Sequence, residues 1–154
     1  MCAAGHRFRL GSADISTAFL NGHQLDRELC MRMPEDLMVP SVAGRVVKVL
    51  KGVYGLRQAP RLWYERLAEE IRALGFRQMK LERTLYVLDD PAHPGRPMAI
   101  VGTHVDDLLC ACTDKGFAVL RQLERPFVIK TWDWDHFTYC GRQVQQMPDM
   151  EVQK

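Results

Sequence analysis

The strongest constraint on the fold is an adjacent pair of carboxylates, Asp106 and Asp107, enclosed by two apolar runs. Residues 98–104 and 108–112 each have the length and apolar character of one strand, and the acidic pair occupies the tight connection between them. Two adjacent carboxylates at such a tip repel each other and lose hydration, which is unfavourable unless a cation or a basic partner neutralises them. The sequence therefore predicts two strands that meet at two carboxylates.

A divalent metal ion is the natural partner of such a pair. Mg²⁺ takes a few carboxylate oxygens together with water and substrate phosphates, so a third acid from another strand end would complete a phosphoryl-transfer site. Asp14 is the best candidate, because it ends a run of alternating apolar and polar residues at 7–14. The alternatives are that Asp106 and Asp107 form an ordinary solvated turn and that Asp14 caps a short helix at 16–20.

The other elements are read from apolar spacing and turn residues. A helix is predicted from Pro60 to Gly75, with an apolar stripe at Trp63, Leu67, Ile71 and Leu74. A second helix is expected at 114–123, capped by Thr113 or Asp114. Short apolar runs predict further strands at 29–33, 45–50, 84–88, 127–131 and 137–144, with a loop at 89–95. Because strands and helices do not alternate strictly, the pattern favours an α+β fold, an antiparallel sheet with helices on one face.

Composition limits the class of protein. The 154 residues suit one domain, and neither a membrane-spanning run nor a secretory signal is seen, so we expect an intracellular protein that is not secreted. The five cysteines suggest neither a disulfide framework nor a CxxC zinc pair. Residues 45–66 contain six Lys and Arg against a single acid, which indicates either a nucleic-acid contact or a solvated surface.

Six sequence blocks, taken in order, resemble the reverse transcriptase of copia-type LTR retrotransposons. The blocks are SADISTAFLNG (12–22), MRMPEDL (31–37), KVLKGVYGLRQAPRLWYERL (48–67), LGF (74–76), TLYV (84–87) and HVDDLL (104–109). The resemblance covers about residues 7–145 and implies an RNA-directed DNA polymerase domain at 1–146, followed by a polar tail at 147–154. It also implies a polymerase palm-like sheet, which composition and periodicity do not show.

The resemblance assigns the metal ligands and catalytic carboxylates of the family to Asp14, Asp106 and Asp107. They would hold two Mg²⁺ ions, or Mn²⁺ in their place, for the attack of a primer 3′-hydroxyl on the α-phosphate of a deoxynucleoside triphosphate (dNTP). Phe19 matches the aromatic position that packs under the incoming sugar, and Gln58 matches a glutamine that touches the nucleotide and the template. The alternatives are a core Phe on a short helix and an ordinary polar residue before a helix.

Further positions are assigned to substrate and nucleic acid in the same way. His104 and Val105 match substrate-binding positions beside the acidic pair, although the family normally has Tyr where this chain has His104. Arg57 and Arg61 would contact template phosphates, with plain solvent exposure as the alternative. Gly141 matches a glycine in the strand pair that helps to hold the primer end, but Trp132 and Trp134 depart from the usual pattern around it.

The resemblance implies partners that belong to a longer protein. They are an RNA or DNA template–primer, dNTPs, and the integrase and RNase H of a Pol polyprotein, located in cytoplasmic virus-like particles or in the nucleus. Only thirteen residues precede Asp14, so we expect incomplete fingers, no thumb and no polymerase activity from the isolated chain. The alternative is a non-catalytic remnant of a decayed element that binds nucleic acid weakly at most.

Overall fold

A computed structural model describes residues 8–147, which fold into two compact units. Unit 1 contains the residues up to Ser16 and those from Ala68 onward, and unit 2 contains Thr17–Leu67. Within residues 8–147, no helix is both long and apolar enough to span a membrane.

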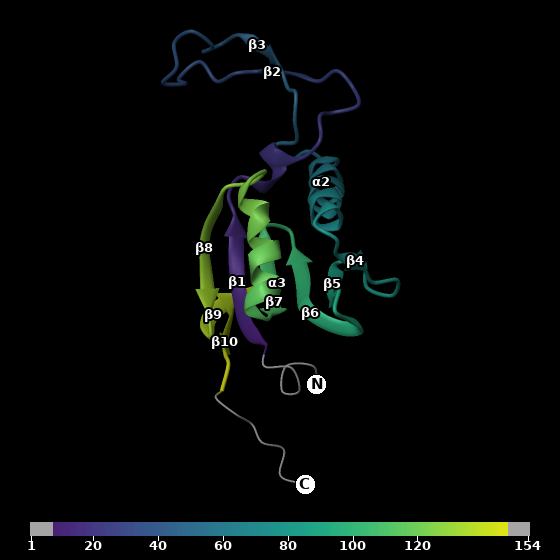
Figure 1. Ribbon diagram of the computed structural model, residues 1–154. Helices are drawn as coiled ribbons and strands as arrows, with labels where there is room; N and C mark the ends of the chain where they lie inside the picture. Colours follow the sequence, from purple (N-terminus) through teal and green to yellow (C-terminus); the bar gives the residue numbers. More distant parts are fainter. Residues whose placement is uncertain (1–7, 148–154) are drawn as a thin grey trace. The chain divides into compact units, whose positions relative to one another are not determined.

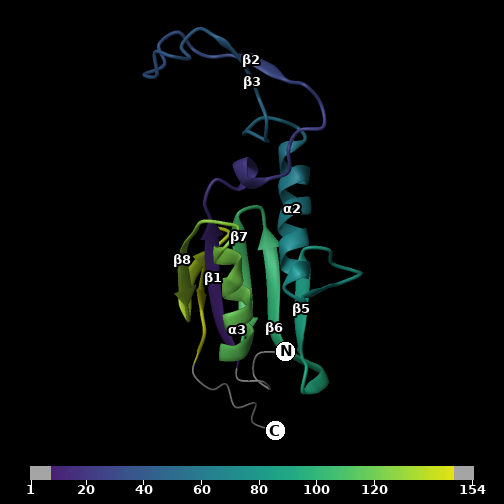
Figure 2. The ribbon, with the colours of Figure 1, turned by 45° about the horizontal axis from the view of Figure 1, so that its top comes forward.

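Unit 1 is built on a six-stranded antiparallel sheet, so the expected α+β class and the antiparallel pairing are confirmed. Figures 1 and 2 show its strands side by side, with β1 in purple between β7 and β8. In spatial order the strands are β4 (Arg77–Gln78), β5 (Leu85–Asp90), β6 (His93–His104), β7 (Asp107–Cys112), β1 (Arg9–Ile15) and β8 (Ile129–Trp134).

One face of this sheet is covered by α3 (Asp114–Leu120), which continues into the short 3₁₀ helix η2 (Arg121–Glu124). The Thr113 side chain caps α3 by accepting a hydrogen bond from the Gly116 amide at 3.2 Å, which settles the choice between the two expected caps. The buried side chains beneath the helix alternate along the strands, and they include Val101, Leu108, Cys110 and Cys112. Both cysteines are therefore core residues, as their spacing predicts.

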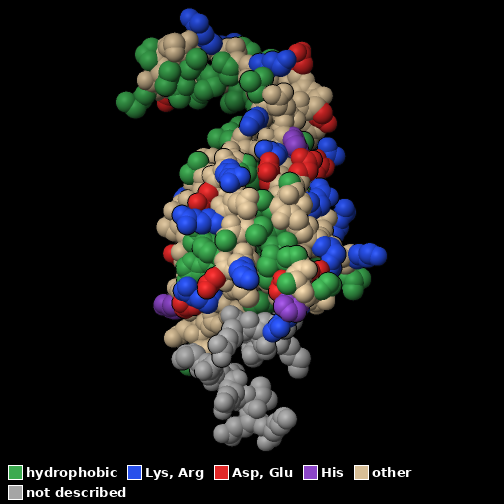
Figure 3. Space-filling view, in the orientation of Figure 1, with side chains coloured by type: hydrophobic (Ala, Val, Ile, Leu, Met, Phe, Trp, Pro, Cys, Tyr) green, Lys and Arg blue, Asp and Glu red, His purple; other side chains and the backbone are tan. Residues whose placement is uncertain are grey.

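Unit 2 contains the 3₁₀ helix η1 (Ala18–Asn21) and the hairpin of β2 (Cys30–Arg32) with β3 (Val46–Lys48). The expected short helix and the expected neighbouring strands are both present. Figure 3 shows hydrophobic side chains gathered over this hairpin and its loop, where the exposed residues are Met31, Met38, Val39 and Val46.

The long helix α2 (Ala59–Ala73) runs from unit 2 into unit 1. Trp63, Leu67 and Ile71 are each at most 2% exposed, so these three residues of the predicted apolar stripe are buried. Leu74, the fourth, is half-buried and follows the last residue of the helix. The helix ends as expected, because Gly75 has a φ of 91° and its amide donates to Arg72. The Phe76 amide donates to Ile71 in addition, and this pair of bonds is the Schellman arrangement that stops a helix.

Two segments differ from the sequence prediction. The expected loop at 89–95 is mostly strand: β5 extends to Asp90 and β6 begins at His93, with register shifts around Asp89. The expected strand at 137–144 is a hairpin of β9 (His136–Tyr139) and β10 (Arg142–Gln145), because Cys140 and Gly141 both have positive φ and reverse the chain. The two-residue strand β4 is not predicted, because its sequence contains no apolar run.

Close contact between α3 and β6 generates a stability prediction. A Cβ added at Gly116 would overlap the Met98 carbonyl and lie 2.9 Å from the Ala99 Cβ. We expect Gly116→Ala to lower the free energy of unfolding in urea by about 1–3 kcal/mol, the usual effect of overpacking. Gly102→Ala is the matched control, because its nearest neighbours lie at 3.9 Å. Equal unfolding free energies for the two variants would contradict this account of the helix–sheet contact.

Candidate active site

The predicted catalytic carboxylates meet at one end of two central strands of the sheet. Asp14 and Asp107 are direct partners in the β1–β7 ladder, and Asp106 lies in the turn that precedes β7. The Ile15 amide donates to the Asp106 carbonyl at 2.9 Å, which fixes the turn to β1. Directly opposed residues of antiparallel strands have Cβ atoms about 4.5–5.5 Å apart. The fold therefore brings all three acids together, while their catalytic role stays a prediction.

The turn that presents the acids has an unusual backbone. Only Val105 and Asp106 connect β6 to β7, and Val105 has a φ of 54°. The left-handed region is strongly disfavoured for a β-branched residue, so the surrounding ladder must hold it there. His104 is exposed and pairs with Asp107 in the β6–β7 ladder, so the imidazole lies beside the acids. Two of the four residues predicted to bind substrate, His104 and Val105, thus directly precede the acidic pair.

Charge is concentrated at this end of the sheet. Partial burial raises the pKa of Asp107 above its ordinary value, and the charges of Asp106 and Asp14 raise it further. His104 and Lys130 act in the opposite direction on that pKa. Like charges placed directly opposite each other weaken a sheet. The cluster consequently needs positive charge close to it.

Lys130 supplies one such charge, and sequence reasoning missed it. Its Nζ lies 2.6 Å from Oδ2 of Asp14, and this contact raises the pKa of the lysine. A single lysine in an apolar strand run gives no indication of its partner. The pairing depends on a register irregularity between β1 and β8, which the sequence pattern does not reveal.

The carboxylates provide the oxygen donors that a hard divalent cation needs. Oδ1 of Asp14 is buried without any hydrogen-bond partner, and such an oxygen is available as a ligand. Within residues 8–147 no three His, Cys, Asp or Glu side chains are arranged closely enough to hold a metal ion as they stand. The carboxylate oxygens are suitable ligands for a cation. To bind one, the acidic side chains would have to reorient, and Lys130 would have to leave Asp14.

In unit 2, Phe19 lines an apolar groove rather than a closed core. Its ring is half-buried and meets Tyr54 edge-to-face, with centroids 4.8 Å apart. The groove has a volume of about 430 Å³, and its other lining residues are Thr17, Leu20, Met31 and Val53. The alternative of an ordinary core phenylalanine therefore does not describe this residue, and its role towards a sugar stays a prediction.

Gln58 and the two arginines also belong to unit 2. The Gln58 Nε2 donates to Asp26 at 3.3 Å, while its Oε1 is buried and lacks a partner. Among the described side chains, Asp14 and Gln58 are the residues with such an unpartnered buried oxygen. Arg57 is exposed, and Arg61 makes a loose surface ion pair with Glu65 at 3.6 Å. Neither arginine is committed to a buried structural role.

Gly141 lies at the tip of the β9–β10 hairpin with a φ of 73°, and nothing lies within 4 Å of a Cβ built there. Backbone conformation alone thus explains a glycine at this position. Its predicted contact with nucleic acid remains a prediction.

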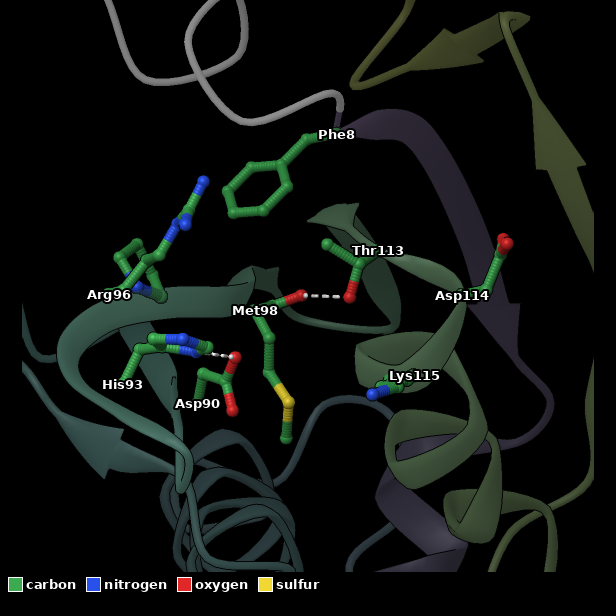
Figure 4. Close-up of a pocket in the computed structure, with 9 residues that line it drawn as sticks. Phe8, Asp90, His93, Arg96, Met98, Thr113, Asp114 and Lys115 are labelled. Atoms are coloured by element: carbon green, nitrogen blue, oxygen red, sulfur yellow. Dashed lines mark hydrogen bonds and ion pairs between the residues drawn. The ribbon is translucent and has the colours of Figure 1, made fainter.

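A separate cavity of about 330 Å³ opens at the opposite end of β6 and β7 (Figure 4). Phe8, Arg96 and Lys115 border it, and the Thr113 hydroxyl donates to the Met98 carbonyl at 3.2 Å in its wall. Asp90 pairs with His93 at 3.0 Å beside it. None of the predicted site residues lines this cavity, so this hollow of unit 1 is not where the acids meet.

Comparison with known proteins defines the class. A family model described as reverse transcriptase (RNA-dependent DNA polymerase) matches residues 2–150. The chain belongs to this reverse transcriptase family.

The relatives narrow the assignment to retrotransposons. The chain is 28% identical over 137 residues to the retrovirus-related Pol polyprotein from transposon RE1 of Arabidopsis thaliana, which covers 88% of this chain and 9% of that protein. It is 33% identical over 119 residues to the Pol polyprotein from transposon TNT 1-94 of Nicotiana tabacum, covering 74% of this chain and 8% of the relative. The resemblance to copia-type reverse transcriptases is thus confirmed, and the chain spans less than a tenth of these relatives.

Charge repulsion among the three acids predicts that Asp107 destabilises the folded protein. A carboxyl whose pKa is raised in the folded protein binds more protons there, so stability falls as pH rises through its ordinary pKa of about 3.9 towards the folded value. Without divalent cations at pH 7, Asp107→Asn should therefore raise the free energy of unfolding by about 0.2–1 kcal/mol.

The measurement is urea unfolding between pH 3.5 and pH 7. The gain from Asp107→Asn should shrink as the pH falls, and the exposed Asp36→Asn should show no such gain. If Asp107→Asn were the less stable protein at pH 7, the acids would not repel one another in the folded chain.

Proposed function

We propose that Asp14, Asp106 and Asp107 hold the divalent cations of RNA-directed DNA synthesis, in a sheet that is the palm of the polymerase. The observation that carries the proposal is the direct cross-strand pairing of Asp14 with Asp107, next to the turn that contains Asp106. A sheet gains nothing from opposed like charges, so a functional requirement accounts for them better than stability does. Membership of the reverse transcriptase family supports the reaction.

The reaction is the in-line attack of a primer 3′-hydroxyl on the α-phosphate of a dNTP, with pyrophosphate as the leaving group. Bound cations would lower the pKa of that hydroxyl and neutralise charge on the leaving group. The carboxylates of this chain would hold those cations, and the β1–β7 ladder would keep the spacing between Asp14 and Asp107 constant. Such positioning provides much of the rate in phosphoryl transfer.

The same proposal gives roles to residues of unit 2. Phe19, in its apolar groove, would pack against the sugar of the dNTP and exclude a ribose 2′-hydroxyl. The unpartnered Oε1 of Gln58 would accept a hydrogen bond from the nucleotide or template. Arg57 and Arg61 would bind template phosphates, which carry charge but no sequence information.

Residues on the primer side come from unit 1. His104 and Val105 would contact the substrate beside the acidic pair, and Gly141 would lie near the primer end. For a whole Pol polyprotein the partners would be a template–primer, dNTPs, integrase and RNase H.

Cation binding tests the proposal and separates it from the alternative, a non-catalytic remnant. We expect the chain to bind Mn²⁺, used as a probe for Mg²⁺, in a titration followed by electron paramagnetic resonance of the free ion. Loss of a ligand should weaken binding about tenfold or more in Asp14→Asn and in Asp106→Asn, since even changes to outer groups at metal sites have effects of about 10- to 100-fold.

Asp133→Asn is the matched control, because this exposed carboxylate lies on β8 of the same sheet and pairs with the Thr131 hydroxyl at 3.2 Å. It should change the Mn²⁺ affinity less than twofold. Equal affinities for all four proteins would reject the assignment of the three acids and favour the non-catalytic alternative.

A further inference from the structure

The Lys130–Asp14 ion pair joins β8 to the acidic end of β1. The Lys130 Nζ lies 2.6 Å from Oδ2 of Asp14, and the two side chains are 58% and 40% exposed. An exposed pair of this kind contributes little to stability, so it can be broken easily. The contact is therefore a reversible one at the residue that is proposed to bind cations.

A bulge in β8 aims the lysine at this position. Ala13 pairs with Trp132 and Ile15 pairs with Ile129, so two residues of β8 face the single residue Asp14. In a regular ladder Lys130 would pair with Ile15 and share the buried side of the sheet, because a shift of one residue exchanges the two faces. Bulges redirect side chains in this way beside functional sites.

The position of β8 is held by aromatic contacts. Trp132 and Trp134 both meet Phe117 of α3 edge-to-face, with ring centroids 5.1 and 4.7 Å apart. The Trp132 indole also donates to Glu124 at 2.8 Å. The two tryptophans that depart from the family pattern thus fix the register of the strand that carries Lys130.

The lysine interacts with the whole acidic cluster. Its hydrogen bond to Asp14 raises its pKa most, and the charges of Asp14, Asp106 and Asp107 raise it further. An ammonium ion and a divalent cation at the same carboxylate would repel each other, since like charges a few ångströms apart interact strongly near a protein surface.

We propose that Lys130 is a displaceable counter-ion of the acidic cluster, which competes with divalent cations for Asp14 and so sets the cation affinity of the site. The proposal rests on the function proposed above, because it takes Asp14, Asp106 and Asp107 as cation ligands. When a cation binds, the lysine leaves Asp14 and its side chain becomes free to meet other anionic groups. Lys130 is a positioning residue in this scheme, since it acts through Asp14.

Neutralising the lysine should tighten cation binding. In Mn²⁺ titrations of the full chain, we expect Lys130→Met to lower the dissociation constant roughly threefold to tenfold, which corresponds to the loss of one competing surface pair. Lys130→Arg keeps the charge, so its dissociation constant for Mn²⁺ should stay within twofold of that of the unchanged protein. Lys48→Met is the matched control for net charge, because Lys48 makes an exposed ion pair of the same 2.6 Å length with Glu28 in unit 2.

Thermal unfolding gives a second readout that does not depend on activity. Without Mn²⁺, Lys130→Met should unfold at a lower temperature than the unchanged protein. Saturating Mn²⁺ should raise the unfolding temperature of Lys130→Met by more than that of the unchanged protein. Lys48→Met should show no such extra gain. This pattern follows from competition between the lysine and the cation. If the lysine only stabilised the sheet, Lys130→Met would lower the unfolding temperature equally with and without Mn²⁺.

The outcomes separate this inference from the proposed function. If Asp14→Asn weakens Mn²⁺ binding but Lys130→Met binds no more tightly than Lys48→Met, the counter-ion role is wrong and the cation site stands. If Lys130→Met binds Mn²⁺ more weakly, the lysine organises the site rather than competing for it, and the proposal is also wrong. If no variant binds Mn²⁺, both proposals fail together.

Discussion

The pairing of Asp14 with Asp107 across two neighbouring strands is the constraint on which the account of this protein depends. Two carboxylates held opposite each other, with a third in the adjoining turn, cannot be explained by the stability of the sheet. The surrounding structure compensates with Lys130 on one side and His104 on the other, and both lower the pKa of Asp107. In our proposal, the same arrangement would hold the divalent cations of a reverse transcriptase domain.

Much of this acidic end could be predicted from local sequence. The two apolar runs around Asp106 and Asp107 specify a hairpin, and the β6–β7 pairing has that form. The alternating run that ends at Asp14 predicts a third strand and makes Asp14 the best candidate for the third acid, and the family motifs strengthen that assignment. Long-range strand order is set by tertiary packing, which a single sequence shows poorly.

The features that the sequence did not reveal depend on register and backbone conformation. Lys130 reaches Asp14 only because β8 contains a bulge, and nothing in the run from 127 to 131 distinguishes a bulged strand from a regular one. The expected strand at 137–144 is divided by positive φ at Cys140 and Gly141, although a glycine at that point is typical of a turn. Residues 89–95 are mostly extended, but the turn-forming residues in this segment predict a loop instead.

The central claim is that a divalent cation binds where the three acids meet. Paramagnetic broadening of backbone amide resonances by Mn²⁺ tests it most directly, because the effect is local to the bound ion. We expect the amides of residues 14–15, 105–107 and 129–131 to broaden first, and we expect Asp106→Asn to remove this broadening. Broadening centred on Asp90 and Asp114 at the opposite end of β6 and β7, with the amides near Asp14 unaffected, would contradict it.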